Sequence, residues 1–418
     1  MTSEEIAQII AYRDQYQHLS PERILLGSTQ IPPSLRSAVA LQIKERKALE
    51  RKLPHWASQG VYLPSSLSLE QCSSQLAATY KQRFVDGQDL VLELSGGLGV
   101  DFSAFVERAA GGIYVEEQEA LIEAASYNLP RLLPRGSFSI VHGNSMELLE
   151  ALVREHRPSL IYVDPARRAG VDRQHRVYAI EDCSPSLSEL LERLPPLYDG
   201  MGSPRPRLLV KLSPMLDLIH TLQQAPHTRE LHIVSVKQEV KELLLLMDLS
   251  IPPLSPESVP VYVVEIDSKG QRQELCWHRG WSEEATAPQR IASVVGEYVY
   301  EPSPAMMKSG FFKSIAARYD LEALHPDAHL YTSDEYKAEF IGRRFRCQEV
   351  IPLRASQLRT IGKRLGRAQI SCRNLSLSPD ELRSRLGIKD GGERTLLGTR
   401  LSDGSQVLLN CYLCSHDE

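Results

Sequence analysis

One stretch of the sequence, LVLELSGGLGVD at Leu90–Asp101, restricts the possible folds more than any other. A short apolar run ends on Glu93, a glycine-rich turn with Gly97 and Gly99 follows, and an amphipathic segment begins near Asp101. A strand, a tight turn and a helix in this order are typical of an α/β sheet that binds a ligand at the strand's carboxyl end. Glycines let such a turn take positive φ angles and let a ligand approach the backbone.

The spacing of the glycines separates two kinds of cofactor. A dinucleotide site requires G-x-G-x-x-G, but Phe102 occupies the position of the third glycine after Gly97 and Gly99. The observed pattern is acid-x-small-x-Gly-x-Gly, formed by Glu93, Ser95, Gly97 and Gly99. It resembles motif I of the class I S-adenosylmethionine (SAM)-dependent methyltransferases. A plain tight turn without a cofactor is the alternative, and the rest of the sequence is needed to distinguish the two interpretations.

The chain after this turn alternates strands with helices, as a doubly wound sheet does. Helices are expected at 102–110, where Gly111–Gly112 would stop the first one, and at 118–129 and 186–194. Seven strands are expected, the last of them antiparallel, at 90–94, 113–115, 138–141, 160–163, 208–212, 231–236 and 261–266.

Polar residues follow the second and third of these strands. Glu116 can accept hydrogen bonds from both hydroxyls of a ribose, a role that dinucleotide and SAM folds share. Asn144 offers a donor and an acceptor to the edge of an adenine, and a turn asparagine is the alternative. We also place Asp101, at the end of the glycine-rich stretch, among the cofactor-binding residues.

The fourth strand ends in Asp164-Pro165-Ala166-Arg167, level with the glycine-rich turn. This resembles motif IV of amino-methylating and RNA-modifying methyltransferases, whose usual form is [DNS]-P-P-[YFW]. In the usual form the aromatic residue stacks on a base taken out of its helix. Arg167 replaces it here, and a guanidinium can stack on a base or clamp a phosphate. We predict Asp164, Pro165 and Arg167 as catalytic residues. We also expect Asp164 to contact the cofactor.

Composition places the chain among ordinary globular proteins. No apolar run approaches the roughly 18 residues that span a bilayer, and the acidic N-terminus lacks a secretory signal, so we expect a cytoplasmic protein without membrane contact. The seven cysteines are scattered, as in a reducing compartment. Cys411 and Cys414 form one C-x-x-C with only His416 nearby, which is too few ligands for zinc, so no metal is expected.

Charge is distributed unevenly along the chain. The net charge is −5, but 341–400 contain about 14 Lys and Arg against about 5 Asp and Glu. A basic module on an acidic body is compatible with RNA binding, and an ordinary solvated surface is the alternative.

The chain divides into four predicted parts. Residues 1–85 are predicted to be helical. Their last segment, 67–84, carries Tyr80 and Lys81 on a helix that we expect to close over the methionine end of SAM. Residues 86–275 are expected to form the methyltransferase domain, 276–328 a small module, and 329–418 a basic α+β domain.

The whole chain resembles a bacterial family of class I SAM-dependent methyltransferases that carry a THUMP-like C-terminal domain. The matching stretches are KLPHW (52–56), LEQCSSQLAATYK (69–81), LSGGLGVD (94–101), DPARR (164–168), KLSPMLD (211–217), EPSPAMMKSG (301–310), HLYTSDE (329–335) and KDGGERTLLGT (389–399). The resemblance implies a helical region, a Rossmann-like SAM domain, a ferredoxin-like insert and a THUMP-like domain. THUMP domains generally present RNA to an attached enzyme.

These observations predict transfer of a methyl group from SAM to a base in tRNA or rRNA. Two alternatives remain: a catalytically silent SAM- and RNA-binding module, favoured by the missing aromatic residue of motif IV, and a methyltransferase for a protein or small molecule.

Overall fold

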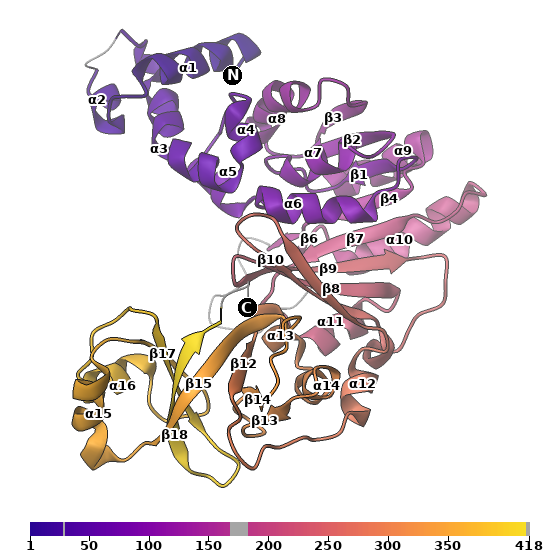
Figure 1. The fold of residues 1–418 in the computed structure, drawn as a ribbon. Helices are drawn as coiled ribbons and strands as arrows, with labels where there is room; N and C mark the ends of the chain where they lie inside the picture. Colours follow the sequence, from indigo (N-terminus) through magenta and orange to yellow (C-terminus); the bar gives the residue numbers. More distant parts are fainter. Residues whose placement is uncertain (28–29, 168–182, 415–418) are drawn as a thin grey trace. The chain divides into compact units, whose positions relative to one another are not determined.

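The computed structural model describes residues 1–27, 30–167 and 183–414, and it begins with a helical region (Figure 1). This region contains α1 (Ser3–Tyr16), α2 (Pro21–Leu25), the 3-10 turn η1 (Pro33–Leu35), α3 (Arg36–Lys52) and α4 (Pro54–Ser58). Thr2 caps α1, since its hydroxyl accepts from the Glu5 N–H while the Glu5 carboxylate accepts from the Thr2 N–H. This reciprocal pair satisfies two N–H groups that the end of a helix would otherwise leave open.

Two short helices connect this region to the sheet. They are α5 (Ser66–Gln71) and α6 (Gln75–Lys81), followed by the 3-10 turn η2 (Gln82–Phe84). The break between the helices arises at Ser74, whose backbone is extended and whose hydroxyl accepts from the Ala77 N–H to start α6. The predicted helix carrying Tyr80 and Lys81 is therefore α6.

The core of the sheet is parallel. Its strands are β1 (Leu90–Glu93), β2 (Gly111–Glu116), β3 (Phe138–His142), β4 (Leu160–Val163) and β7 (Arg207–Leu212), in the order β3-β2-β1-β4-β7. Because these strands run in one direction, the residues that follow β1, β2 and β4 meet at one edge. The α/β class and the Rossmann-like order are as predicted.

The far side of the sheet differs from the prediction. The order continues β7-β9-β8-β10-β11, with β8 (Thr228–Val236), β9 (Glu239–Asp248), β10 (Val261–Ile266) and β11 (Arg272–Trp277). The antiparallel strand beside β7 is β9, with Leu243 opposite Leu212. The assignment of 261–266 as the seventh and last strand was wrong, since the sheet has nine strands within the described residues.

The strand β9 escaped prediction because its apolar run, Leu243–Met247, shows no alternation. A run of this kind does not distinguish a strand buried on both faces from a buried helix. The turn before it also carries no glycine: Lys237 and Gln238 take φ angles of 54° and 62°. Non-glycine residues adopt such angles infrequently, so the turn gave no signal in the sequence.

Helices α7 (Val100–Val106), α8 (Glu119–Leu132), α9 (Ser145–His156), α10 (Leu187–Gly200) and α11 (Leu218–Gln224) connect the strands. The prediction that Gly111–Gly112 stop the first helix was wrong, because both glycines belong to β2. A Cβ on Gly112 would lie 2.7 Å from side-chain atoms of Phe102 and Val106. Glycine is needed there because α7 packs closely on the strand.

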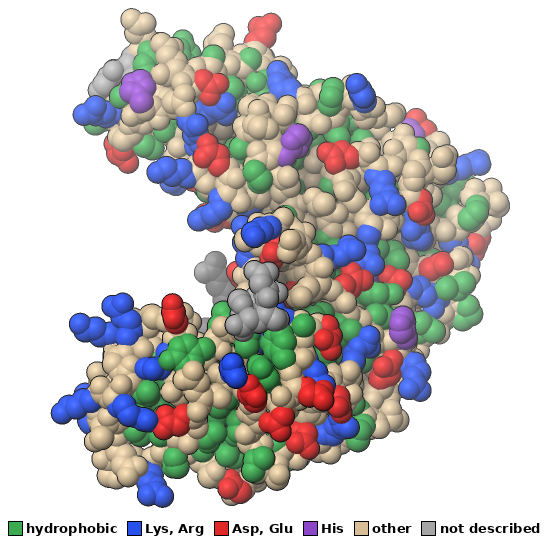
Figure 2. Space-filling model, viewed as in Figure 1, with side chains coloured by type: hydrophobic (Ala, Val, Ile, Leu, Met, Phe, Trp, Pro, Cys, Tyr) green, Lys and Arg blue, Asp and Glu red, His purple; other side chains and the backbone are tan. Residues whose placement is uncertain are grey.

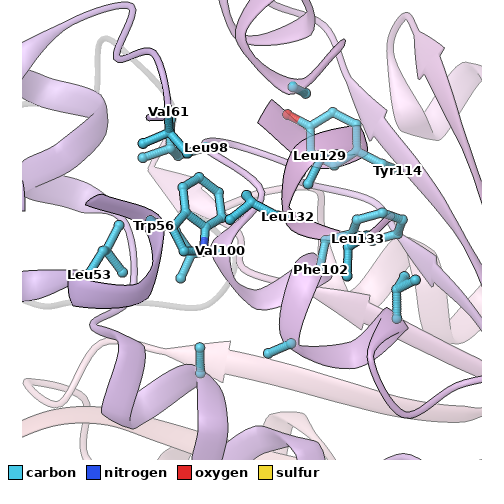
Figure 3. Close-up of a cluster of buried hydrophobic side chains, with 14 of the residues drawn as sticks. Leu53, Trp56, Val61, Leu98, Val100, Phe102, Tyr114, Leu129, Leu132 and Leu133 are labelled. Carbon is cyan, nitrogen blue, oxygen red and sulfur yellow. The ribbon is translucent and has the colours of Figure 1, made fainter. Parts of the chain in front are cut away.

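The helical region and the sheet share one hydrophobic core (Figure 3). Trp56 of α4 is 3% exposed and lies in the same cluster as Val100 and Phe102 of α7 and Leu129 of α8. Pro54 lies in the first turn of α4, and the buried Leu53 before it belongs to the same cluster as Trp56. The KLPHW stretch therefore contributes to the packing behind the glycine-rich turn.

The C-terminal part contains a second, seven-stranded sheet. Its strands are β12 (Tyr298–Pro302), β13 (Glu322–Ala323), β14 (Tyr331–Ser333), β15 (Gly342–Pro352), β16 (Gln369–Cys372), β17 (Arg394–Arg400) and β18 (Gln406–Leu413), in the order β13-β14-β12-β15-β18-β17-β16. Its helices are α12 (Trp281–Thr286), α13 (Pro304–Ser309), α14 (Phe312–Arg318), α15 (Leu358–Leu365) and α16 (Pro379–Leu386).

Helices α15 and α16 pack in one hydrophobic cluster. Leu358, Ile361 and Leu365 of α15 are buried, and a Cβ on Gly362 would lie 1.9 Å from the carbonyl oxygen of Leu386. The helix therefore crosses the end of α16 at a glycine. This contact depends on tertiary packing. From the sequence alone, a glycine inside a short segment lowers the expectation of a helix, so α15 was not predicted.

The chain divides into two compact units, residues 1–232 with 241–256 and residues 233–240 with 257–418. None of the helices in the described part of the chain combines the length and the apolar character that a bilayer crossing requires.

Candidate functional site

The glycine-rich turn after β1 is shaped by its glycines. Gly97 and Gly99 have φ angles of 56° and 85°, and Gly99 is the N-cap of α7. A Cβ on Gly96 would lie 2.4 Å from the ring of Tyr114, whose hydroxyl donates to the Gly97 carbonyl at 2.5 Å. A side chain on Gly97 would meet only open space within 3.8 Å. The turn therefore leaves room on the side where a ligand would lie.

The carboxylate of Glu116 lies beside this turn. One oxygen accepts from the Gly97 N–H at 2.8 Å and the other from the Gln118 N–H at 2.9 Å. The side chain is buried. A carboxylate oxygen has two lone pairs, so each oxygen keeps capacity for a ligand hydroxyl.

Asn144 begins α9 at the next strand end. Its Oδ1 accepts from the N–H groups of Met146 and Glu147, and its Nδ2 donates to Glu117 at 3.3 Å. The amide thus caps α9, while Asn144 and Glu117 both line the pocket.

Asp164 follows β4 at the same edge. Its backbone N–H donates to the Ser95 hydroxyl at 2.7 Å, and its carboxylate forms an ion pair with Lys211. Pro165 comes next, and the backbone of Ala166–Arg167 forms β5, paired with β6 (Cys183–Ser184). The side chain of Arg167 lies outside the described part of the structure. Ser95 thus links the glycine-rich turn to the predicted motif IV.

A buried charge network lies behind the turn. Lys81 is fully buried, and its Nζ lies 2.7 Å from Glu242 and 3.1 Å from Asp101. Asp101 also accepts from the Ser73 and Tyr162 hydroxyls at 2.8 and 2.7 Å. Asp101, predicted to bind the cofactor, therefore belongs to this network while also lining the pocket.

Two buried carboxyls of the site have opposite pKa shifts. Burial raises the pKa of Glu93 well above its ordinary value, and the charges of Asp101 and Asp164 add to the effect. Burial alone would raise the pKa of Asp101 too, but the charges of Lys81 and Lys211 hold it below its ordinary value. Carboxyls whose pKa values are pushed apart in this way are typical of functional sites.

Sequence reasoning did not predict the ion pairs that three charged residues form at this site. Lys81 and Lys211 stand inside segments that the sequence marks as helix and strand, and Glu242 precedes the apolar run of β9. The sequence offered one signal of this pairing, namely a single charged residue beside a long apolar run. A charge in such a place is buried only when an opposite charge pairs with it. Lys81 and Glu242 are 161 residues apart, so their pairing could not be predicted from spacing.

The segment 68–73 forms another wall of the site. Ser68, Gln71, Cys72 and Ser73 line the pocket. Lys52 holds this segment in place, since its ammonium donates to the carbonyls of Leu69 and Glu70 at 2.7 and 2.8 Å. The segment before the first strand therefore contributes to the pocket through α5 and the turn after it, whereas Tyr80 and Lys81 of α6, the helix expected to close over SAM, are not among the lining residues.

These parts enclose one pocket at the carboxyl edge of the parallel strands. Its walls come from the ends of β1, β2, β3 and β4 and include eight of the predicted site residues, namely Glu93, Ser95, Gly97, Gly99, Asp101, Glu116, Asn144 and Asp164. Tertiary structure thus gathers side chains that are up to 71 residues apart in the sequence. In the described part of the chain, no group of three or more His, Cys, Asp or Glu is arranged to hold a metal ion.

Comparison with solved structures identifies a full-length relative. A protein of Porphyromonas gingivalis W83, whose crystal structure is described as that of a "putative methyltransferase", is 40% identical, with a TM-score of 0.88. The match covers 99% of this chain and 100% of that chain. The chain belongs to this methyltransferase family.

Other relatives define the family further. Two proteins from strains of Mycobacterium tuberculosis, each called an uncharacterized S-adenosylmethionine-dependent methyltransferase, are 23% identical over 351 residues, which is 83% of this chain and 87% of theirs. Family models match at 1–45 ("N-terminal domain in putative methyltransferase"), 298–340 ("ferredoxin-like domain") and 342–412 ("THUMP domain-like"). The family is thus one of SAM-dependent methyltransferases with a THUMP-like C-terminal domain.

The pocket fits the cofactor of this family. The Oε2 atom of Glu93 is buried and has no hydrogen-bond partner among the described residues, which leaves an acceptor or a donor for a ligand. The turn at Gly97 offers open space, and Glu116 presents its carboxylate from the tip of β2. Acidic groups facing the pocket suit the positive charge of SAM.

Proposed function

We propose that this methyltransferase modifies a base in RNA, with SAM held in the pocket at the carboxyl edge of the sheet. When bound, SAM supplies the methyl group from its sulfonium. In this proposal the turn at Gly97 and Gly99 admits the methionine part, Glu116 holds the ribose and residues around Asn144 hold the adenine. Glu93, Ser95 and Asp101 form the floor, and Asp164 meets the acceptor.

The observation that carries the RNA part of the proposal is the basic face of a helix in the THUMP-like region. Helix α15 buries its apolar side, while Arg359, Lys363 and Arg364 are exposed, and Arg367 follows just beyond the helix end. Blue side chains gather over this part of the surface in Figure 2. Clustered lysines and arginines on one helix face are typical of phosphate-backbone contacts.

The basic face has few acidic neighbours to neutralise it. Arg364 pairs with Glu349 at 3.0 Å, an exposed contact that contributes little. Positive charge therefore remains available on α15. Together with the family match over 342–412, this supports RNA over a small-molecule substrate.

The proposed chemistry places three residues at the acceptor. Asp164 accepts a hydrogen bond from the acceptor group, Pro165 restricts the backbone there, and Arg167 stacks on the base or clamps a phosphate. Methyl transfer is an in-line displacement, so holding the acceptor in line is expected to supply most of the rate.

The experiment that tests this function is transfer of labelled methyl from SAM to total RNA from cells that lack the protein, followed by nucleoside analysis. One labelled nucleoside would support the proposal and identify the base. SAM binding by calorimetry without any labelled RNA would count against it, in favour of another acceptor or of a binding module without turnover. An Asp164→Asn sample is the control for contaminating activity.

A further inference from the structure

Lys211 and Asp164 stand side by side because of the register of the sheet. Strands β4 and β7 pair in parallel with Val163 opposite Val210, and Asp164 and Lys211 are the next residues on each strand. Their side chains form an ion pair between Lys211 Nζ and Asp164 Oδ2. Two neighbouring strands of the buried sheet therefore define this pair, which makes it more constrained than an ion pair on a surface loop.

The two partners differ in exposure. The side chain of Lys211 is 13% exposed and that of Asp164 is 38% exposed. Asp164 lines the pocket, whereas Lys211 is not part of its wall. The carboxylate thus faces the space where the acceptor would lie, and the ammonium supports it from behind.

The groups around the pair favour a charged lysine. Burial alone lowers the pKa of Lys211, but the negative charges of Asp164, Asp101 and Glu242 raise it above its ordinary value. Among the described residues, Glu93 of β1 and Tyr162 of β4 are other titratable groups that interact with Asp164. Burial raises the pKa of both, which disfavours a second negative charge beside Asp164.

We propose that Lys211 is a positioning residue that holds the Asp164 carboxylate in one orientation toward the pocket. This inference rests on the proposed function, in which Asp164 meets the methyl acceptor. A carboxylate paired with a buried ammonium accepts hydrogen bonds well, but taking a proton would leave the ammonium without its partner. Asp164 therefore orients the acceptor by accepting a hydrogen bond and does not remove its proton.

The test follows the carboxyl carbon of Asp164 directly in the full chain, without SAM or RNA. Protein labelled with 13C at the aspartate carboxyl carbons is compared with its variants at about pH 7. The Asp164 signal is identified by its absence from an Asp164→Asn sample. This readout does not depend on activity, so it decides the role of Lys211 even where the proposed function fails.

Removing Lys211 should move this signal. In Lys211→Met the chemical shift of the Asp164 carboxyl carbon should change, because the charge-assisted hydrogen bond from the ammonium is lost. Lys211→Arg should stay near the wild type, since a guanidinium keeps the charge. Lys44→Met, which removes a lysine that is 63% exposed on α3, should leave the signal unchanged. Equal chemical shifts in the wild type and in Lys211→Met would overturn the proposal.

Methyl transfer gives a second readout that a merely structural role would not move. In Lys211→Met the kcat of methyl transfer should fall while the KM for SAM stays near the wild-type value, and Lys211→Arg should restore kcat. A parallel loss of kcat and of SAM affinity contradicts the proposal. Should Lys211→Met fail to fold, Lys211→Gln takes its place in both measurements. Absence of transfer in the wild type would count against the proposed function only.

Discussion

The carboxylate of Glu116 closes the glycine-rich turn by accepting a hydrogen bond of 2.8 Å from the backbone N–H of Gly97. The tip of β2 and the turn after β1 are therefore tied together by the side chain that we propose for the ribose. A ligand would meet a carboxylate whose orientation is already set by Gly97 and Gln118. Such preorganisation lowers the entropy lost on binding.

Glu116→Ala is expected to weaken SAM binding by tenfold or more, about 1.4 kcal/mol, because both the ribose acceptor and the support of the turn are lost. Isothermal titration calorimetry on the full chain measures the effect. Glu119→Ala, three residues further along at the exposed start of α8, is the matched control and should bind normally. An unchanged affinity in Glu116→Ala would remove the ribose assignment.

Asp164→Asn is expected to lower methyl transfer by about 100-fold or more while SAM affinity stays within a few-fold of the wild type. Asparagine keeps the shape of the side chain but loses the charged hydrogen-bond acceptor and the pairing with Lys211. Asp164→Ala is a less selective test, since it also leaves a cavity beside the ammonium. Single-turnover transfer and calorimetry on the same samples separate chemistry from binding. A parallel loss of both would indicate a structural role.

Lys81→Met is expected to destabilise the protein by about 3–5 kcal/mol, because Asp101 and Glu242 would be left buried without their shared cation. Urea unfolding followed by circular dichroism measures the loss. Lys47→Met, at an exposed position of α3, should change stability by less than about 0.5 kcal/mol. Similar behaviour of the two variants is incompatible with the network described above.

Glu93 should make stability depend on pH. Burial raises its pKa in the folded state, so the folded protein keeps a proton that the unfolded chain releases. The resulting stability is present below the unfolded-state pKa of about 4.3 and is lost as the pH rises through the folded-state value. Glu93→Gln cannot ionise, so its stability relative to the wild type should increase from about pH 5 to about pH 8. The midpoints of urea unfolding of both proteins at the two pH values measure this change. A difference in stability between the variant and the wild type that is the same at both pH values would contradict burial of the neutral Glu93 side chain.

Charge reversal on α15 tests the RNA surface. Arg359→Glu combined with Lys363→Glu should weaken RNA binding and lower the slope of log affinity against log salt by one to two, since each phosphate contact contributes about 0.7–0.9 to that slope. Filter binding at several salt concentrations provides the measurement. Lys269→Glu, in the exposed turn between β10 and β11, is the control. Equal slopes for the wild type and the double variant would show that RNA does not bind on α15.

Local patterns in the sequence were sufficient for much of the fold and for the composition of the pocket. The turn at Gly97 and Gly99, the strand end at Asp164 and the acid at Glu116 could be predicted because short-range rules link these residues to backbone geometry. In parallel strands the carboxyl ends meet at one edge, so three separate motifs implied one site. Pattern rules failed at β9 and at Gly112, where burial on both faces and close helix packing override local preference.

Tertiary structure alone decided which charges meet. The sequence determined that a SAM-type turn and an acid at a strand end belong to one sheet, because these features depend on neighbouring residues. The contacts of Lys81 with Glu242 and of Lys211 with Asp164 join residues 161 and 47 positions apart. They form only when β4, β7 and β9 take their places in the sheet, since a buried charge is tolerated only where packing brings its partner.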